Sequence, residues 1–527
     1  MTHLRRRLPA RRAEPPRPAR RRRPRTVRAA GLTLALTAAL GLAACTTPAA
    51  TDGQAVTTFD AASADDLPTT PAGAAATWVV SVLGAATPPT AADIEEHFAA
   101  SYLATTPVAT TQQALAEARS GGPYEMVGFE DGGDVLLLSL DSAAGPRVAI
   151  GIEVDTQGDL TAFSLTQVRT IPTIASVTDL DKALEGTSTD TAYLLARIDG
   201  SGAGCQAPVI ASNADTTMPV GRLADLYVLG AVASAIDNGD LDGEEPLTLT
   251  QSLVAPGPGR LSDDSVGATV SVSEAAIRMI RESDATASTM LVNAVGEGTV
   301  RDAASTMGLS DPTSLNPLLT PRALAQIAWS RTGMREAWSA AADAGDASAT
   351  LAHRTALVNA LGRGNPDVDT AAMGDIVWPD GLSWFATAED VCQAQTALAD
   401  LEADGAAAAP VTSAALVAQG GARIDDAVWT GATYVGAIAP GQTGMAWTFT
   451  DTEGARWSLV ILQAGDDPLS YPSFAWLSGV AEQLIGLVPG LVGLSTPTPT
   501  AGSGTAAPAS PTVGEPARAT ASPTPEE

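Results

Sequence analysis

The spacing of hydrophobic and polar positions changes along the chain and predicts an ordered series of helices and strands. Apolar residues recur at helical spacing over residues 74–83 and again over 91–102. Four runs typical of strands follow, at residues 124–129, 135–140, 147–154 and 160–168. Helices that precede a curled antiparallel sheet predict a small α+β domain over residues 71–173.

The longer region that follows, residues 174–494, alternates predicted helices with a few short strands. One strand is predicted near its start, over 192–198, and two near its end, over 445–450 and 457–463. A turn at Thr452-Glu453-Gly454 joins the last two, and a final helix is predicted over 472–487. Strands at both ends of a helical block indicate a single sheet built from distant segments of the chain, an α-β-α arrangement.

Both ends of the chain have compositions that do not support a packed core. Residues 45–70 are rich in Thr, Ala and Asp, which predicts a flexible tether. Residues 495–527 repeat Thr-Pro, Ser-Pro and Ala-Pro units without apolar periodicity, so we expect an extended, disordered tail there.

The first 44 residues have the organisation of a lipoprotein signal peptide. Twelve arginines lie between Arg5 and Arg28, and an apolar stretch follows up to Ala44 and ends directly before Cys45. This resembles a lipobox, in which small residues precede a cysteine that becomes diacylated. Two acyl chains suffice for stable anchoring. We therefore expect lipidation at Cys45 and an exported protein anchored to the outer face of the cytoplasmic membrane; the alternative is a plain secretory signal with an incidental cysteine.

The charge of the remaining chain excludes nucleic acid as a partner. The full chain has 30 Lys and Arg against 59 Asp and Glu, a net charge of -29. Without the first 44 residues, 18 basic and 58 acidic residues remain, a net charge of -40. So acidic a body repels phosphate backbones and anionic lipid head groups. Neutral, cationic or protein partners fit better, such as peptidoglycan or another envelope protein, with the membrane reached through the lipid.

Cysteine and histidine usage limits the possible chemistry further. After Cys45 only Cys205 and Cys392 remain, and they either form one disulfide in an oxidising compartment or stay as two buried thiols. The three histidines are scattered, so no histidine-based metal site is expected, and nothing in the sequence points to a cofactor.

Several segments, in the same order along the chain, resemble class A β-lactamase-like serine hydrolases, a family that shares its fold with DD-peptidases. Residues 219–230 read Pro-Val-Gly-Arg-Leu-Ala-Asp-Leu-Tyr-Val-Leu-Gly, similar to the helix start that usually reads Gly-Ser-x-x-Lys-Leu-Tyr-Val-Leu-Gly in the family. Residues 279–287 resemble its Ser-Asp-Asn loop, 316–322 the end of its omega loop, and 384–390 a helix start. Residues 436–447 fall where its Lys-Thr-Gly-type strand belongs.

The resemblance covers residues 178–490 and implies a class A β-lactamase-like domain. Some relatives, including one from a clavulanic-acid gene cluster, carry a small domain in front of it. The predicted α+β domain over residues 71–173 resembles the cone-shaped nuclear-transport-factor-like fold of that domain. The implied fold class is therefore α+β followed by α-β-α.

The catalytic positions of the family are degenerate in this chain. Family members use a serine nucleophile, a lysine one turn later and a second lysine on the last strand. Arg222 stands at the serine position and Asp225 at the first lysine. Ser283 and Asp284 persist in the second motif, but Ala285 replaces its asparagine, and Ile438 to Gly441 replace the Lys-x-Gly strand. The only lysine of the chain is Lys182, which precedes all these motifs in a predicted outward-facing helix. A mechanism with two lysines is therefore not available.

Two interpretations of the altered site remain open. Arg222 and Asp225, three residues apart on a helix, either fill a vacated cleft as a charge pair or leave Arg222 to bind a ligand carboxylate. We expect Ser283 to order its loop beside Asp284, and Trp429, Trp447 and Trp457 to pack in the core. The leading hypothesis is a non-catalytic pseudoenzyme that acts as a binding or scaffolding module. The alternatives are a divergent hydrolase with a remodelled cleft and a binding site confined to the small N-terminal domain.

Overall fold

The structure is a computed structural model that describes residues 67–493 except 144, 188, 200–201, 263–264, 344, 417–420, 426 and 466–470. The described residues all fall within one compact unit. Cys45, the predicted signal peptide and the Pro-rich tail lie outside the described residues.

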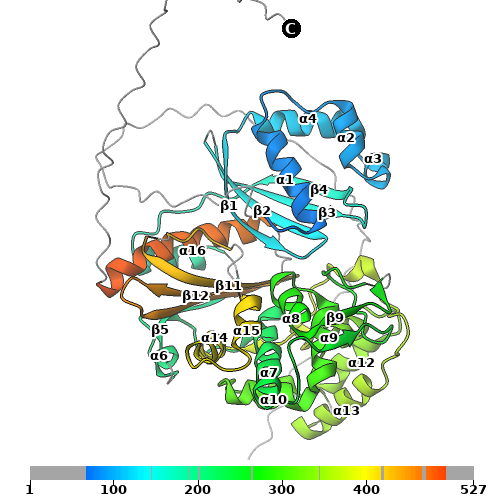
Figure 1. The fold of residues 1–527 in the computed structure, drawn as a ribbon, viewed down its shortest axis with the longest axis vertical. Coiled ribbons are helices and arrows are strands. Elements are labelled where there is room, and N and C mark those ends of the chain that lie inside the picture. The colour runs from blue at the N-terminus through cyan, green and yellow to red at the C-terminus, as the bar shows by residue number, and fades with distance from the viewer. Residues whose placement is uncertain are drawn as a thin grey trace, which may run out of the picture. The chain divides into compact units, whose positions relative to one another are not determined.

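The N-terminal part of the fold consists of four helices followed by one antiparallel sheet (Figure 1). The helices are α1 (Pro71–Gly84), α2 (Ala91–His97), α3 (Ala100–Thr105) and α4 (Val108–Arg119). The strands are β1 (Tyr124–Asp131), β2 (Val135–Ser142), β3 (Val148–Val154) and β4 (Leu160–Gln167), in the spatial order β1-β2-β3-β4. Each strand lies within two residues of its predicted bounds, and the predicted α+β domain is confirmed.

Two details of this part differ from the expectations. The predicted helix over 91–102 is broken, because Phe98 is extended and bridges Leu160 of β4, which places its ring in the core. The fold also begins before residue 71, since Leu67 is buried and Thr70 accepts the N–H of Gly73 as the cap of α1. Residues 67–70, which were expected to belong to the tether, are therefore part of the fold, and residues 45–66 lie outside the described residues.

The second part is built on a five-stranded antiparallel sheet whose strands come from both ends of the region. Its spatial order is β11-β12-β13-β5-β6. The strands are β5 (Asp190–Ile198), β6 (Ile210–Ser212), β11 (Trp429–Ala439), β12 (Gln442–Asp451) and β13 (Arg456–Ala464). The pairing of β5 with β13 joins segments more than 250 residues apart, which is the closure predicted from the sequence.

A helical block and two small strand pairs lie between β6 and β11. The helices around this sheet are α5 (Val177–Glu185), α6 (Ala203–Gln206), α7 (Asp225–Asp237), α8 (Val272–Arg281), α9 (Ala285–Val295), α10 (Glu297–Thr306), α11 (Pro321–Ala328), α12 (Met334–Ala341), α13 (Ala347–Asn359), α14 (Ala388–Ala403), α15 (Ala409–Leu416) and α16 (Tyr471–Val492). Short 3₁₀ turns are η2 (Gly221–Ala224), η4 (Pro312–Leu315), η5 (Thr370–Ala372) and η6 (Trp378–Asp380). β7 (Met218–Pro219) pairs with β10 (Phe385–Ala386), and β8 (Pro246–Thr248) with β9 (Thr269–Ser271).

The two faces of the five-stranded sheet bury two separate cores. Along β5, Leu194 packs with α7 and α14 on one face, whereas Tyr193 and Leu195 pack with α16 on the other. Trp429, Trp447 and Trp457 are all buried in the core beneath α16 and are thus packing residues, as expected. Residues Phe474–Val492 of α16 are long and apolar enough to cross a membrane, but 67% of this stretch is buried inside the fold.

A disulfide links α6 to α14. Cys205 of α6 is bonded to Cys392 of α14, at a sequence separation of 187 and with 5.8 Å between their Cα atoms. Both residues are fully buried, and the Cys205 sulfur also lies 3.5 Å from the hydroxyl of Thr396.

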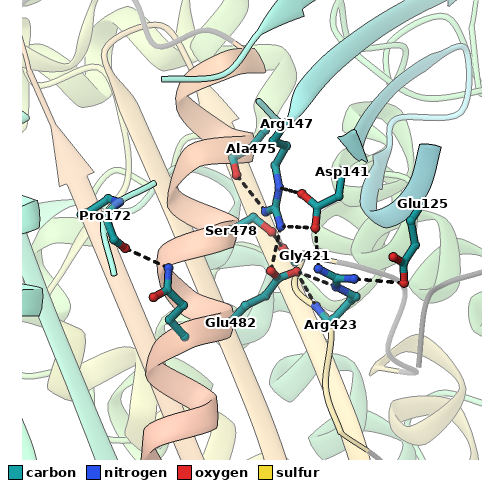
Figure 2. A network of polar contacts seen from close by, with 10 residues as sticks. Glu125, Asp141, Arg147, Pro172, Gly421, Arg423, Ala475, Ser478 and Glu482 are labelled. Carbon is teal, nitrogen blue, oxygen red and sulfur yellow. Dashed lines mark hydrogen bonds and ion pairs between the residues drawn. The ribbon is translucent and has the colours of Figure 1, made fainter. Parts of the chain in front are cut away.

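The N-terminal sheet contacts α16 through a buried network of charged side chains (Figure 2). Arg147 donates to Asp141 at 2.7 Å and to Glu482 of α16 at 2.9 Å, and its side chain is only 5% exposed. Arg423 donates to Asp141 at 2.6 Å and to Glu125 at 3.2 Å, while its backbone N–H donates to Glu482. Burial raises the pKa of Asp141, but the two arginines outweigh it and hold that pKa below its usual value.

We expect Glu482→Met to lower the free energy of unfolding by about 3–5 kcal/mol, because it removes the buried carboxylate that both arginines contact and leaves Asp141 as the only carboxylate they share. Urea unfolding at pH 7.5 measures the change. The control is Lys182→Met, since the Lys182 side chain is 71% exposed and lies 4.0 Å from Asp179. The control should shift stability by about 0.5 kcal/mol or less, and equal losses in both variants would contradict the assignment.

Candidate functional site

The altered catalytic positions lie at the start of α7, beside the edge strand β11. Gly221 adopts a φ of +52°, which turns the chain from β7 into the short helix η2. η2 contacts both β11 and β12 and leads directly into α7. This turn brings Arg222 and Asp225 to the place that the family resemblance assigns to the nucleophile and the first lysine.

Arg222 and Asp225 form an ion pair that is almost closed to solvent. Arg222 Nε lies 2.5 Å from Asp225 Oδ2, and the two side chains are 15% and 8% exposed. Ser288 of α9 donates to Asp225 Oδ1 at 2.8 Å, and Arg222 also donates to the carbonyl oxygen of Asp284 at 3.2 Å. Burial raises the pKa of Asp225, while the charge of Arg222 and the hydroxyl of Ser288 oppose that rise.

Asp284 holds the local backbone together. Its carboxylate accepts the N–H groups of Ala287 at 2.8 Å, Arg260 at 2.8 Å and Leu261 at 2.9 Å, and it caps α9. The residue is fully buried, and burial raises its pKa despite these hydrogen bonds. A Cβ atom on Gly259, which has a φ of +123°, would lie 2.3 Å from the Asp284 carboxyl carbon. The Asp284 carboxylate therefore holds residues 259–261 against the N-terminus of α9.

Ser283 and Ala285 flank this aspartate. Ser283 has a φ of +47°, a left-handed conformation that costs a non-glycine residue about 1–3 kcal/mol. Ala285 is buried, and its N–H donates to the carbonyl of Pro258. Both residues thus shape the connection between α8 and α9 next to Asp225.

The structure does not bring Ile438 and Gly441 to the ion pair. Ile438 packs on the α16 face of the sheet, and its neighbour Ala437 packs on the face that Leu223 of η2 shares. Gly441 lies in the turn after β11 with a φ of +72°, close to Ile376. Because side chains alternate along a strand, Ala437 is the β11 residue that faces the start of α7.

The space beside the ion pair is small. A cavity of about 10 Å³ adjoins Asp225 and Ser288, and its other lining residues are Ala224, Val228, Val292, Val300, Leu315, Leu318, Leu319, Pro321 and Trp384. This volume holds about one water molecule, whereas ligand pockets usually measure about 300–1,000 Å³. Among the described residues, no group of three or more His, Cys, Asp or Glu is placed to hold a metal ion.

Sequence reasoning missed Ser288, the hydroxyl that completes this site. Its only signal was position: it follows the N-cap Asp284 by four residues, so it projects from the first turn of α9 on the same side. No family motif pointed to it, because it lies outside the Ser-Asp-Asn segment.

Comparisons with known proteins identify two matching family models and several similar solved structures. Residues 205–363 match the model described as "Beta-lactamase enzyme family", and residues 67–160 match the one described as "ORF 12 gene product N-terminal". No curated protein matches the chain. Similar solved structures include a β-lactamase from Sphaerobacter thermophilus, with 17% identity, 61% of this chain and 99% of that chain covered, and a TM-score of 0.38. The structure of PBP-A has 14% identity, coverage of 61% and 100%, and a TM-score of 0.38.

Residues 205–363 in the C-terminal part of the chain are thus similar to the β-lactamase enzyme family, the resemblance that the motifs indicated. A separate N-terminal α/β domain with its own four-stranded sheet precedes it.

We expect Arg222→Met to destabilise the fold by about 3–5 kcal/mol at pH 8, because Asp225 stays buried without its counter-charge. The loss should shrink toward pH 5. Without Arg222 the pKa of Asp225 rises further above its unfolded value, so the folded state keeps a proton that is lost as the pH increases. Urea unfolding at both pH values measures this.

The double variant Arg222→Met/Asp225→Asn provides the matched control, because its amide at position 225 is neutral and the amide oxygen can still accept from Ser288. It should regain most of the stability and lose the pH dependence. An Arg222→Met loss that is the same at pH 5 and pH 8 would contradict a role for Arg222 as the counter-charge of Asp225.

Proposed function

We propose that this chain is a non-catalytic, lipid-anchored envelope protein that uses a serine hydrolase fold as a binding or scaffolding module. The observation that carries the proposal is the ion pair between Arg222 and Asp225, which occupies the positions of the nucleophile and its lysine. Ser288 donates a hydrogen bond to Asp225 of this pair, and the adjoining cavity holds about one water molecule.

The chemistry of the family supports the absence of turnover. A serine attacks a carbonyl only when a base takes its proton and the substrate carbon comes within about 3–3.5 Å. The single lysine, Lys182, is 71% exposed on α5, a helix that packs in the α16 core rather than beside α7. It is therefore on the wrong face of the sheet to act on a substrate near Arg222.

One contact favours the divergent hydrolase as a second candidate. Ser288 donates to Asp225 at 2.8 Å, the arrangement of a hydroxyl nucleophile with a carboxylate base. However, Ser288 is 1% exposed, and Asp225 already pairs with Arg222. A substrate carbonyl would have to displace this packing before it could reach the hydroxyl.

The binding role follows from what remains when catalysis is absent. The fold retains a two-domain body of high negative charge, which suits neutral or cationic partners such as peptidoglycan fragments or an envelope protein. The lipidated Cys45 would hold this body at the outer face of the cytoplasmic membrane.

The proposal predicts that residues 58–527 neither hydrolyse a chromogenic cephalosporin nor form an adduct with a fluorescent penicillin. Intact mass spectrometry at protein concentrations that reveal a single acylation measures this, beside an active class A β-lactamase as positive control. A stable adduct or turnover that survives repurification and is abolished by Ser288→Ala would replace the proposal with the divergent hydrolase.

Lipid anchoring has its own test. We expect Cys45→Ser to move the full-length protein from the membrane fraction to the soluble exported fraction, because the thiol that carries the diacylglycerol is gone. Cys205→Ser serves as the control and should leave the protein in the membrane fraction. Membrane retention of the Cys45→Ser protein would remove the lipoprotein part of the proposal.

A further inference from the structure

The β1–β2 turn brings a group of carboxylates into contact with the β-lactamase-like domain. Glu130 and Asp131 end β1, and Asp134 immediately precedes β2. We refer to residues 130–134 as the acidic turn. Asp131 is buried, and its carboxylate accepts from Thr70 at 3.2 Å and from the N–H of Gly133 at 2.9 Å.

One side of the acidic turn contacts the edge strand β11. Glu130 Oε1 accepts a hydrogen bond from the hydroxyl of Tyr434. A Cβ atom on Gly436 would lie 1.8 Å from the same carboxylate oxygen, so only glycine leaves room for Glu130 there. Gly436 stands two residues after Tyr434, on the same face of the strand.

The other side of the acidic turn contacts residues 257–261, which we call the wall loop. A Cβ atom on Gly133 would lie 2.7 Å from Cγ of Arg260, and one on Gly132 would lie 3.4 Å from Cβ of Pro258. Burial raises the pKa of Asp134, and a hydrogen bond from the backbone N–H of Gly259 opposes that rise. The turn therefore lies directly against this loop.

The wall loop connects the acidic turn to the ion pair of the candidate site. Arg260 and Leu261 donate their N–H groups to Asp284, and Asp284 in turn accepts from Arg222. Three successive contacts thus connect the acidic turn to Arg222: from the turn to the wall loop, from the wall loop to Asp284, and from Asp284 to Arg222.

The contact carries more buried carboxylates than well-placed cations. Glu282, at the end of α8, and Asp284 face the acidic turn from the β-lactamase-like domain, and Glu153 lies near Asp134.

The cations near these carboxylates are Arg260 and Arg281 near Asp131, Arg278 near Glu282 and Arg222 near Asp284. Arg260 lies 3.8 Å from Glu282, a loose pair. Asp134 Oδ1 and Glu282 Oε2 are buried without a hydrogen-bond partner among the described residues.

These surroundings raise the pKa of several acids toward neutral pH. Burial raises the pKa of Glu130 to about 7, although the Tyr434 hydroxyl opposes the rise, and nearby Asp131 adds to it. Burial likewise raises the pKa of Glu282 to about 7 and that of Asp131 to about 6, against the partial compensation of nearby arginines and hydrogen bonds.

We infer that the acidic turn is a pH-dependent latch between the two domains, closed over the wall loop when its carboxylates are protonated and loosened when they ionise. Ionisation places like charges face to face in a contact that holds too few cations, which favours separation of the turn from β11 and the wall loop. The latch does not depend on whether the site is catalytic, because a hydrolase at Ser288 would lie behind the same loop.

The direction of the pH effect follows from proton linkage. Acids whose pKa is raised in the closed contact bind more protons there than when exposed to water. The closed contact is therefore most stable below about pH 4, the ordinary range of these acids. Its stability falls as the pH rises through the values of about 6 for Asp131 and about 7 for Glu130 and Glu282.

Hydrogen–deuterium exchange of residues 58–527, at pH 5.5 and pH 8.0 and corrected for the intrinsic rate, tests the latch. Peptides that contain the acidic turn and the wall loop should lose about tenfold or more protection at pH 8.0, relative to β13 in the same sample, since one pKa unit corresponds to a factor of ten. Protection that is equal at both pH values would overturn the inference without any variant.

Variants identify the responsible groups. Glu130→Gln/Glu282→Gln should keep the turn protected at pH 8.0, because neutral amides replace the groups that ionise. Gly436→Ala should expose the turn already at pH 5.5, since its Cβ takes the place of the Glu130 carboxylate. The control Glu96→Gln changes the same charge on an exposed part of α2 and should behave as wild type. A double variant with the wild-type pH dependence would refute the latch.

Discussion

The buried charge of Asp225 is the constraint on which the altered site depends. A carboxylate at the start of α7, in the apolar space between α9 and η4, is stable only with a cation and a hydroxyl donor beside it. Arg222 and Ser288 supply both, from a turn and from a neighbouring helix. As a result, the guanidinium of Arg222 lies at the position that the family resemblance assigns to the serine nucleophile. The same ion pair therefore stabilises this part of the fold and supports the proposal that the protein is non-catalytic.

The same physical requirement joins the two domains. Glu482 lies on α16, the helix that covers one face of the five-stranded sheet, and there it meets Arg147 from the N-terminal sheet and Arg423 (Figure 2). Glu482 therefore pairs with side chains from both parts of the fold. The N-terminal domain contacts the β-lactamase-like domain at this network and again at the wall loop beside the candidate site.

Local patterns in the sequence predicted the elements well, and long-range contacts poorly. Runs of strand-forming residues predicted β1 to β4 to within two residues, because such runs are a local signal. The break at Phe98 was missed, since its extended backbone depends on a bridge to Leu160 that no local signal reveals. The charge pair of Arg222 and Asp225 could be foreseen from their spacing on a helix, whereas Ser288 could not. The partners of Glu482, Glu130 and Asp284 are distant in sequence, and only the folded chain brings them together.

The disulfide between Cys205 and Cys392 has a consequence for the integrity of the molecule. It encloses the start of α7, the wall loop and α9 in one covalent ring of the chain. A protease that cuts one peptide bond inside this ring opens it but does not divide the protein, because the two pieces stay joined through sulfur. A nicked copy would therefore migrate as a single species until a reducing agent separates it, and its C-terminal strands and α16 would remain attached to the N-terminal domain.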